Sequence, residues 1–544
     1  MNIVNDADPN SKQVYFDGYL PPSKKKTRLE RLRAQTRRLN EYHSLNPQPC
    51  RLYIAPRHTI SRNLFGEGAA GAHLKLISPP AFLVPAVIDA LRNSRHLRDT
   101  VTTVPDEADI YCATYVKKHG GTVITGDSDL LVHDLGQEGA VCFFKDIQVG
   151  DLGESLRGHI YTPTDMMAQL NLYRKDGIRA LAYELLQDQH STFPKLLART
   201  SLNAAINADP EGYRIFCDEY ISLPGDSKVE LCLQQNKFVQ VLQNMDPRIS
   251  EYVLQFPSIA KIAGHFVTAT EAPHVFLPFI LDWPERTSAW EISTSVRQLA
   301  YGLINMVVPE DEQRFTAFEH RRLQTTSSGR AWQLPGLPQI PDACSSLLEL
   351  LSNIREKFPK IPEKKFWVAV AVYLDVEWSS SREKLCISKE VMQQLDRLEK
   401  IPISNKQSSW AMIQFLAQVQ ASYYSLRILK QIISVVMAHQ ACAAFPKSAL
   451  QLSKQLETLP TLDADTSVLQ SFSDIAPAQL REVLITSNKL LGLEDTAGNL
   501  ELTEESGLSK GKQRKKRRKE APVLVKDSAK WQKRDNPFTL LDSE

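Results

Sequence analysis

Two pairs of acidic residues lie close together in the first quarter of the sequence. Glu107 and Asp109 follow Pro105, and Asp127 and Asp129 follow the apolar run Thr-Val-Ile-Thr-Gly. Carboxylates that are brought together raise one another's pKa unless a cation neutralises them. Oxygen ligands of this kind suit Mg²⁺ or Mn²⁺, and two such ions can hold the attacking and leaving oxygens of a phosphodiester. The pattern indicates phosphodiester chemistry, with helix caps and turn residues as the alternative.

The elements that must position these carboxylates are short apolar runs alternating with helical patterns. Such alternation indicates an α/β fold with a parallel sheet flanked by helices. Ligands of such sheets bind beyond the carboxyl ends of the strands, where Asp17 and Asp127 fall. Residues 45–79 carry glycine, proline and polar clusters, which predict a loop or insert. The expected strands cover residues 14–16, 122–125 and 140–144, and the expected helices cover residues 23–42, 80–92 and 106–118.

The spacing within each acidic pair sets a geometric condition. If the chain is still extended after the strand, Asp127 and Asp129 leave the same face. Residues two apart on a regular helix do not face each other, so Glu107 and Asp109 can act together only if they straddle the helix start.

Two motifs in this order resemble the XPG and flap-endonuclease superfamily, whose nuclease core is PIN-like. One is Glu107-Ala-Asp109-x-x-x-Ala followed by Gly-x-Val-x-Thr-x-Asp127-Ser-Asp129-Leu-Leu-Val-His-Asp-Leu-Gly. The other is Val-Tyr-Phe-Asp17-Gly-x-x-Pro-Pro followed by basic residues. The resemblance covers roughly residues 13–200. A long helical part and the lack of an obvious helix–hairpin–helix glycine motif after the core are more similar to the Asteroid branch.

This resemblance implies a metal-dependent, structure-selective endonuclease that uses two Mg²⁺ or Mn²⁺ ions. Its expected substrate is branched or overhanging DNA rather than RNA. Asp188 matches the family's last carboxylate, although Gln187 stands where the family has glycine, and a polar helix-end residue is the alternative. The implied catalytic and metal-binding residues are Asp17, Glu107, Asp109, Asp127 and Asp129, with Asp188 as a further metal ligand.

The family's first core strand, which carries another metal-binding aspartate after a Met-Gly-Ile start, has no evident counterpart. Asp6 and Asp8 lie in a polar leader, residues 1–12, for which we expect disorder. Activity is therefore an open question at the level of the sequence. The alternative function is a catalytically inactive nuclease-fold protein that binds nucleic acid or protein partners.

A strongly basic helix is expected directly after the Asp17-Gly18 strand end. In the flap-endonuclease family this position begins a helical arch whose basic residues contact phosphates without reading sequence. A solvated charged helix is the alternative. The nucleic-acid-binding residues implied by the resemblance are Lys24, Lys25, Lys26, Arg28 and Arg31.

Composition and the absence of certain motifs argue against several other classes of protein and site. The net charge is +2, and the eight cysteines include no Cys-x-x-Cys pair, which argues against a zinc ribbon or a disulfide framework. The longest apolar run, residues 366–374, is far shorter than the ~18 residues of a membrane span, so we expect a buried strand or core helix there and no membrane partner. No phosphate-binding loop, nucleophile elbow or zincin motif is present.

These patterns predict that the chain divides into four segments. They are a disordered leader (1–12), an α/β PIN-like and flap-endonuclease-like domain (13–200), a mostly helical domain (201–502) and a disordered basic tail (503–544). The tail predicts a nuclear localisation signal and hence a nuclear protein. The residues of this signal are Lys510, Lys512, Arg514, Lys515, Lys516, Arg517, Arg518 and Lys519.

Overall fold

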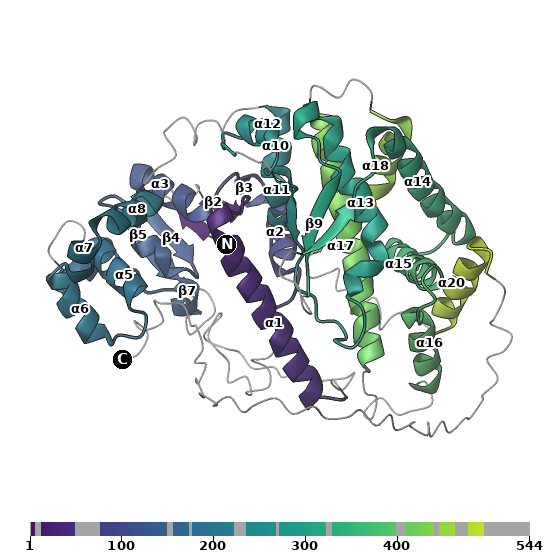
Figure 1. Ribbon diagram of the computed structural model, residues 1–544, viewed down its shortest axis with the longest axis horizontal. Coiled ribbons are helices and arrows are strands. Elements are labelled where there is room, and N and C mark those ends of the chain that lie inside the picture. The colour runs from purple at the N-terminus through teal and green to yellow at the C-terminus, as the bar shows by residue number, and fades with distance from the viewer. Residues whose placement is uncertain are drawn as a thin grey trace, which may run out of the picture.

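The chain folds into an α/β region and a larger helical region that lie side by side (Figure 1). Most buried side chains up to Phe216 pack within the first region, whereas most of those from Phe238 onward form the core of the second, which Tyr19 also joins. The packing thus divides the chain later than residue 200, where the sequence pattern changes. The computed structural model describes residues 2–5, 12–48, 77–149, 156–172, 177–221, 236–267, 271–322, 329–398, 409–439, 445–462 and 477–493.

The α/β region is built on a five-stranded sheet with the order β3-β2-β1-β4-β5. β2 is parallel to β3 and β4 is parallel to β5, whereas β1 is antiparallel to its neighbours β2 and β4. Four strands therefore run in one direction and end at one edge, which we call the carboxyl edge. The strands span Asn2–Asn5 (β1), Lys12–Asp17 (β2), Val101–Val104 (β3), Gly121–Thr125 (β4) and Gly139–Phe143 (β5).

Helices cover both faces of this sheet. They span Leu83–Asn93 (α2) and Ala108–His119 (α3). Alternate side chains of a strand point to opposite faces, so Val14 and Phe16 of β2 pack against Ile88 of α2. Tyr15 packs on the other face, beside Tyr111 of α3. The α/β fold that the alternating pattern predicts is confirmed.

β1 occupies the central position of the sheet, within the leader for which the sequence predicts disorder. Its two β-branched residues favour a strand. Its last residue, Asn5, lies opposite Lys12 at the beginning of β2. The carboxyl end of β1 is therefore at the edge opposite to Asp17. β1 fills the place of a central strand without directing its carboxyl end to the carboxyl edge.

A group of short helices completes the α/β region. Tyr183 of α5 packs against Phe216 of α8, and Arg199 of α6 donates to the buried Glu184 at 2.9 Å. The elements span Gln148–Val149 (β6), Leu156–Arg157 (β7), Pro163–Gln169 (α4), Gly177–Gln187 (α5), Phe193–Ser201 (α6), Ala204–Ala208 (α7) and Pro210–Ile221 (α8).

The helical region is organised around α17, which contacts most of the other helices there. Residues 366–374 are buried in α15, so the core-helix alternative for this apolar run is confirmed. None of the described helices has the length and apolarity that a membrane span requires. The helices are Lys237–Gln243 (α10), Pro247–Val253 (α11), Pro257–Ile262 (α12), Thr294–Leu303 (α13), Ile340–Lys357 (α14), Glu363–Ser380 (α15), Ile387–Leu398 (α16), Trp410–Ala438 (α17), Lys447–Leu456 (α18) and Pro477–Leu490 (α20).

A small sheet lies within this mostly helical region. Its order is β10-β9-β8, with β8 parallel and β10 antiparallel to β9. The strands span His274–Phe276 (β8), Thr316–His320 (β9) and Arg330–Gln333 (β10).

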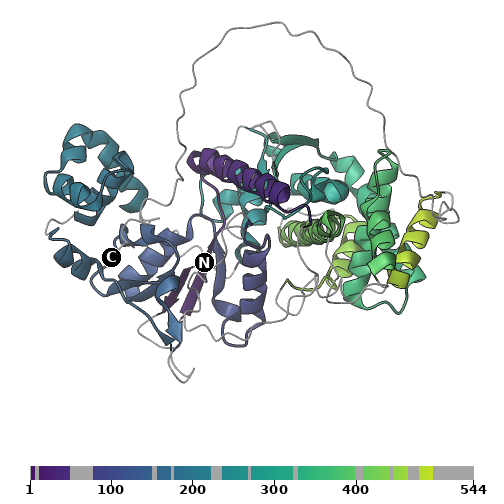
Figure 2. The same cartoon turned by 90° about the horizontal axis from the view of Figure 1, so that it is seen from below.

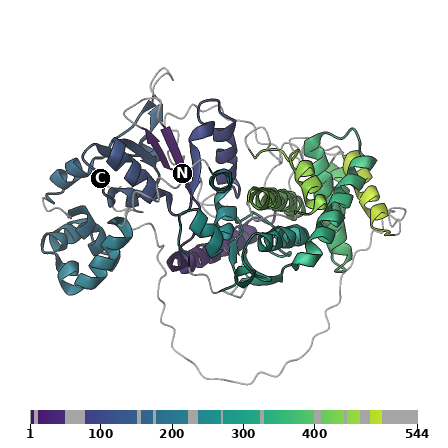
Figure 3. The same ribbon diagram turned by 90° about the horizontal axis from the view of Figure 1, so that it is seen from above.

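Helix α1 (Lys25–Leu45) joins the two regions. Its buried side chains Leu39 and Tyr42 pack with Trp410 of α17, whose indole N–H donates to the carbonyl of Asn46 at 2.9 Å. Figures 2 and 3 show α1 lying along one side of the molecule across the junction. The carboxyl end of α1 is therefore held against the helical region, while Lys24, just before its amino end, contacts Glu107 beside the sheet.

Candidate functional site

The carboxyl edge of the sheet gathers the acidic residues that the sequence predicts. Asp17 is the last residue of β2, Glu107 follows β3, and Asp127 follows β4. Because these strands run in one direction, the carboxylates reach one edge from segments far apart in the sequence. The prediction that Asp17 and Asp127 lie beyond the carboxyl ends of strands is confirmed.

Asp17 is held by the backbone around it. Its Oδ1 accepts a hydrogen bond from the N–H of Ala108 at 2.8 Å, at the amino end of α3. The next residue, Gly18, donates its N–H to the carbonyl of Asp106 at 3.2 Å. A Cβ at Gly18 would lie 2.1 Å from the carbonyl oxygen of Val104, so the close approach of β2 and β3 requires glycine here.

Glu107 and Asp109 straddle the start of α3, as their joint use requires. Glu107 is the N-cap residue, with extended backbone angles (φ −75°, ψ 134°), and Asp109 lies in the first turn. Burial raises the pKa of Glu107, and the nearby carboxylate of Asp17 adds to this, whereas Lys24 opposes it. The Lys24 ammonium lies 2.5 Å from Glu107 Oε1. A cation of the chain itself thus neutralises this carboxylate.

Asp127 and Asp129 do not lie on an extended chain. β4 ends at Thr125, and Asp127 caps a short 3₁₀ helix, Ser128–Leu131. Asp127 Oδ1 accepts from the N–H of Asp129 at 3.1 Å. The condition under which both side chains would leave one face is therefore not met, because the backbone is extended at Asp127 but turns into the 3₁₀ helix from Ser128 onward.

Asp188 lies apart from this group. It follows the end of α5, where its carboxylate accepts from the N–H of His190 at 3.3 Å and lies 3.7 Å from Arg199. A hydrogen bond from Ser191, together with His190, Lys195 and Arg199, lowers its pKa. The structure therefore places Asp188 in a local cap, which is the alternative that the sequence left open.

With Glu107 paired to Lys24, the carboxylates do not form a metal centre. Among the described residues, no three His, Cys, Asp or Glu side chains converge as metal ligands would. β1 separates the strand that ends at Asp17 from the strand that precedes Asp127, a spacing of roughly 10 Å across two strand intervals. Glu107 is paired with Lys24. Asp6 and Asp8 lie outside the described residues.

The basic residues of α1 divide into two groups. Lys24 pairs with Glu107, Lys25 Nζ lies 2.7 Å from His274 Nε2, and Arg28 donates to Glu251 at 3.3 Å. Through these three contacts the amino end of the helix packs against the rest of the chain. Lys26 and Arg31 instead are exposed to solvent, together with Arg33, Arg37 and Arg38. This exposed basic face is accessible for binding a polyanion.

Two further polar residues lie at the edge and were not predicted from the sequence as site residues. His265 Nδ1 lies 3.5 Å from Asp106 Oδ2, and the His265 ring packs on Tyr19 with centroids 4.3 Å apart. Asp106 stands inside the acidic motif, so its position could have singled it out. His265 follows α12 in the helical region, and no sequence pattern around it indicates a position at the edge.

His133 lies beneath the acidic edge and is buried. Burial lowers its pKa to about 4, against a hydrogen bond to the backbone of Tyr220 and the charge of Asp127. Its ring packs edge-on against Tyr220 of α8 at 5.3 Å. The neutral ring is thus part of the packing between the strand ends and the short helices.

Residues 79–334 match the family model whose description is "XPG domain containing". This segment is XPG-like. It includes both acidic pairs and the His265 loop, while Asp17 and the basic helix α1 lie before it. It also extends past residue 200, well into the helical region, beyond the span of the motifs. No curated protein and no solved structure matches the chain.

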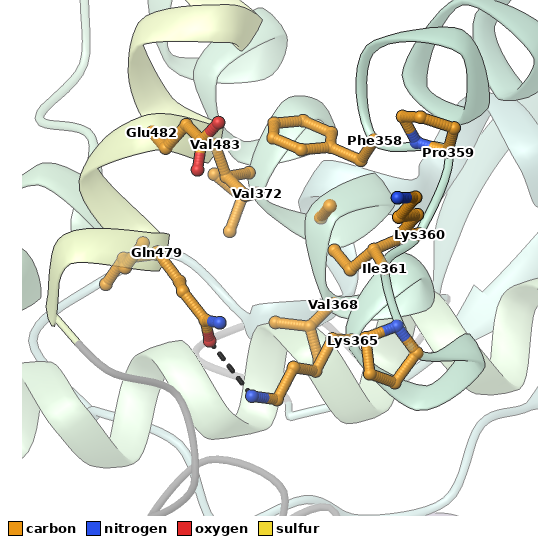
Figure 4. A pocket seen from close by; sticks show the side chains of 13 residues that line it. Phe358, Pro359, Lys360, Ile361, Lys365, Val368, Val372, Gln479, Glu482 and Val483 are labelled. Atoms are coloured by element: carbon orange, nitrogen blue, oxygen red, sulfur yellow. Dashed lines mark hydrogen bonds between the residues drawn. The ribbon is translucent and has the colours of Figure 1, made fainter.

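A cavity of about 380 Å³ lies outside the XPG-like segment, between α15 and α20. Its walls are largely apolar, with Phe358, Ile361, Val368 and Val483 among them, and Lys365 donates to Gln479 at 2.9 Å across its mouth (Figure 4). Figure 1 shows these helices at the far end of the helical region from the sheet. The cavity therefore plays no part in the chemistry of the carboxyl edge.

Proposed function

We propose that this chain is a nucleic-acid-binding relative of the structure-selective endonucleases in which Lys24 holds hydrolysis back. The observation that carries the proposal is the carboxyl edge itself. Acidic residues of an XPG-like segment gather there, and the amino end of a basic helix reaches the same edge with Lys24 paired to Glu107. The expected ligand is DNA with branches or overhangs.

The charge arrangement supports binding without a metal ion. An ammonium 2.5 Å from Glu107 offsets part of the negative charge that would otherwise repel a phosphate. The exposed basic face of α1 continues from this point along the junction of the two regions. Phosphate contacts from such a face give affinity and orientation rather than sequence preference.

Two finer assignments belong to the same proposal. A relationship with the Asteroid branch is supported by the long helical region that follows the XPG-like core. Nuclear localisation is supported by the basic block of residues 510–519, which lies outside the described residues. Transfer of this block to a cytoplasmic reporter protein would test the second assignment by the reporter's position in the cell.

A metal-dependent endonuclease is the second candidate function, favoured by the presence of both acidic pairs at one edge. Mg²⁺ or Mn²⁺, as two ions, would then be the cofactor. Asp17, Glu107, Asp109, Asp127 and Asp129 would have to move together to hold it, and Glu107 would have to leave Lys24. Rapid cleavage by the unaltered chain, lost on Asp127→Ala plus Asp129→Ala, would favour this candidate.

Charge reversal on α1 tests the binding function. We expect Lys26→Glu plus Arg31→Glu to weaken binding of a labelled flap DNA by about tenfold or more at moderate salt, because two exposed cations are replaced by anions. The slope of log affinity against log salt should fall by about 2, one unit for each lost phosphate contact. Fluorescence anisotropy with the full chain measures both quantities.

The matched control is Lys447→Glu plus Lys454→Glu, which reverses two exposed charges on α18, away from the sheet. Both double variants change the net charge equally, so only position differs between them. Equal losses of affinity in the two would mean that net charge rather than α1 attracts the DNA. An unaltered chain that binds no nucleic acid would refute the proposed function.

A further inference from the structure

Phe266 is the most exposed of the large apolar side chains that the structure describes, with 77% of its surface accessible. It directly follows His265, which contacts Asp106 at the carboxyl edge. Consecutive Cα atoms lie about 3.8 Å apart, so the backbone of Phe266 is held close to the carboxyl edge. A large aromatic side chain thus faces solvent beside the acidic residues.

The segment around Phe266 is anchored on both sides. α12 ends at Ile262 and is followed by Gly264, whose φ of +80° suits glycine, and the N–H of His265 donates to the carbonyl of Ala260 at 2.8 Å. His265 then packs on the buried ring of Tyr19, and Val267 packs against the core of the helical region. Phe266 is therefore presented outward by a fixed backbone rather than left exposed at the tip of an unanchored loop.

Two exposed lysines belong to the elements that meet near Phe266. Lys261 on α12 is exposed, and Lys24 has 46% of its side chain accessible beside Glu107. A protein-binding patch would place several apolar side chains together, whereas the residue before Phe266 is a histidine that contacts the carboxylate of Asp106. Aromatic rings interleaved with cations are the arrangement that binds single-stranded nucleic acid, because bases stack on the rings while phosphates contact the cations.

We propose that Phe266 is a stacking platform for an unpaired base of single-stranded DNA or RNA at the carboxyl edge. Lys24 and Lys261 would contact the flanking phosphates. The inference rests on the proposed function and narrows it, because it assigns the edge to unpaired strands, such as a flap or overhang, rather than to continuous duplex.

Replacement of Phe266 tests this assignment in the full chain. A base stacked on an aromatic ring contributes roughly 1–3 kcal/mol, so we expect Phe266→Ala to weaken binding of a fluorescein-labelled oligo-dT strand about tenfold. Phe266→Tyr keeps the ring and should retain the affinity, whereas Phe266→Leu keeps apolar surface only and should not. Affinity for a blunt duplex of the same length should change less than twofold.

Phe315→Ala serves as the matched control, since Phe315 is also an exposed phenylalanine, with 47% of its surface accessible, before β9. It should leave both affinities unchanged. If the unaltered chain binds the strand and Phe266→Ala binds it equally well, the stacking assignment is wrong while the proposed function stands. If the unaltered chain binds neither strand nor duplex, both fail together. Thermal unfolding should be unchanged in the Phe266 variants, because that ring is exposed.

Discussion

At the carboxyl edge, one lysine determines the charge state of the site. The Lys24 ammonium lies against Glu107, so the edge already contains a cation where the resemblance expects a metal ion. The residue types of this edge were predictable, because acidic pairs and a basic helix are visible in the sequence. The pairing of Lys24 with Glu107 was not, because it depends on how β2, β3 and α1 meet.

Beneath the edge, His133 makes the stability of the α/β region depend on pH. Burial lowers its pKa from 6.5 to about 4, so the unfolded chain binds more protons than the folded chain between these values. Stability therefore falls as the pH falls through this window, by about 3 kcal/mol at ~1.4 kcal/mol per unit. When the pH is lowered from 7 to ~4.5, we expect the free energy of unfolding of His133→Gln to fall by about 2 kcal/mol less than that of the unaltered chain.

Urea unfolding at the two pH values measures this difference. His96→Gln is the matched control, since His96 is exposed in the segment after α2 and its replacement should not alter the pH dependence. The same acid destabilisation in all three proteins would contradict the role given to His133.

Among the elements, regular strands and helices were predictable and their pairing was not. The helical patterns of residues 80–92 and 106–118 predict the helices α2 and α3. The antiparallel β1 was missed because four strand residues in a polar leader give little signal before their partners are known. The contact of His265 with Asp106 likewise joins segments with no common local pattern.

Helices α2 and α17 are joined by a buried ion triad that links the two regions. Arg427 of α17 donates two hydrogen bonds of 2.8 Å to Asp89 of α2, and bonds of 2.7 and 2.8 Å to Asp246. All three side chains are at least 90% buried. Loss of the arginine leaves two carboxylates without their cation, so Arg427→Met should lower the free energy of unfolding by about 3–5 kcal/mol.

The control variant for this prediction also removes the two buried carboxylate charges that the loss of Arg427 would leave unpaired. Arg427→Met combined with Asp89→Asn and Asp246→Asn should recover part of the loss, because no unpaired charge then remains buried. Urea denaturation of the full chain provides the measurement. A cost below ~1 kcal/mol for Arg427→Met alone, as for a surface pair, would show that the triad does not hold the regions together.

On the scale of the whole molecule, the junction of the two regions and the carboxyl edge coincide. β2 and α3 bring the acidic residues from one side, and α12 brings His265 and Phe266 from the other. Helix α1 passes along the junction (Figure 2). The sequence predicted a nuclease-like half and a helical half, but not that the helical half contributes to the edge.

Lys24 provides the most direct test of this account, through single-turnover cleavage of a labelled flap DNA in Mn²⁺ at saturating protein. We expect the unaltered chain and Lys24→Arg to bind and cleave slowly, because a cation stays on Glu107. Lys24→Ala should cleave at least about tenfold faster, equivalent to about 1.4 kcal/mol, and adding Asp127→Ala and Asp129→Ala should abolish that gain. Equal rates for the unaltered chain and Lys24→Ala, whether fast or absent, would contradict the account.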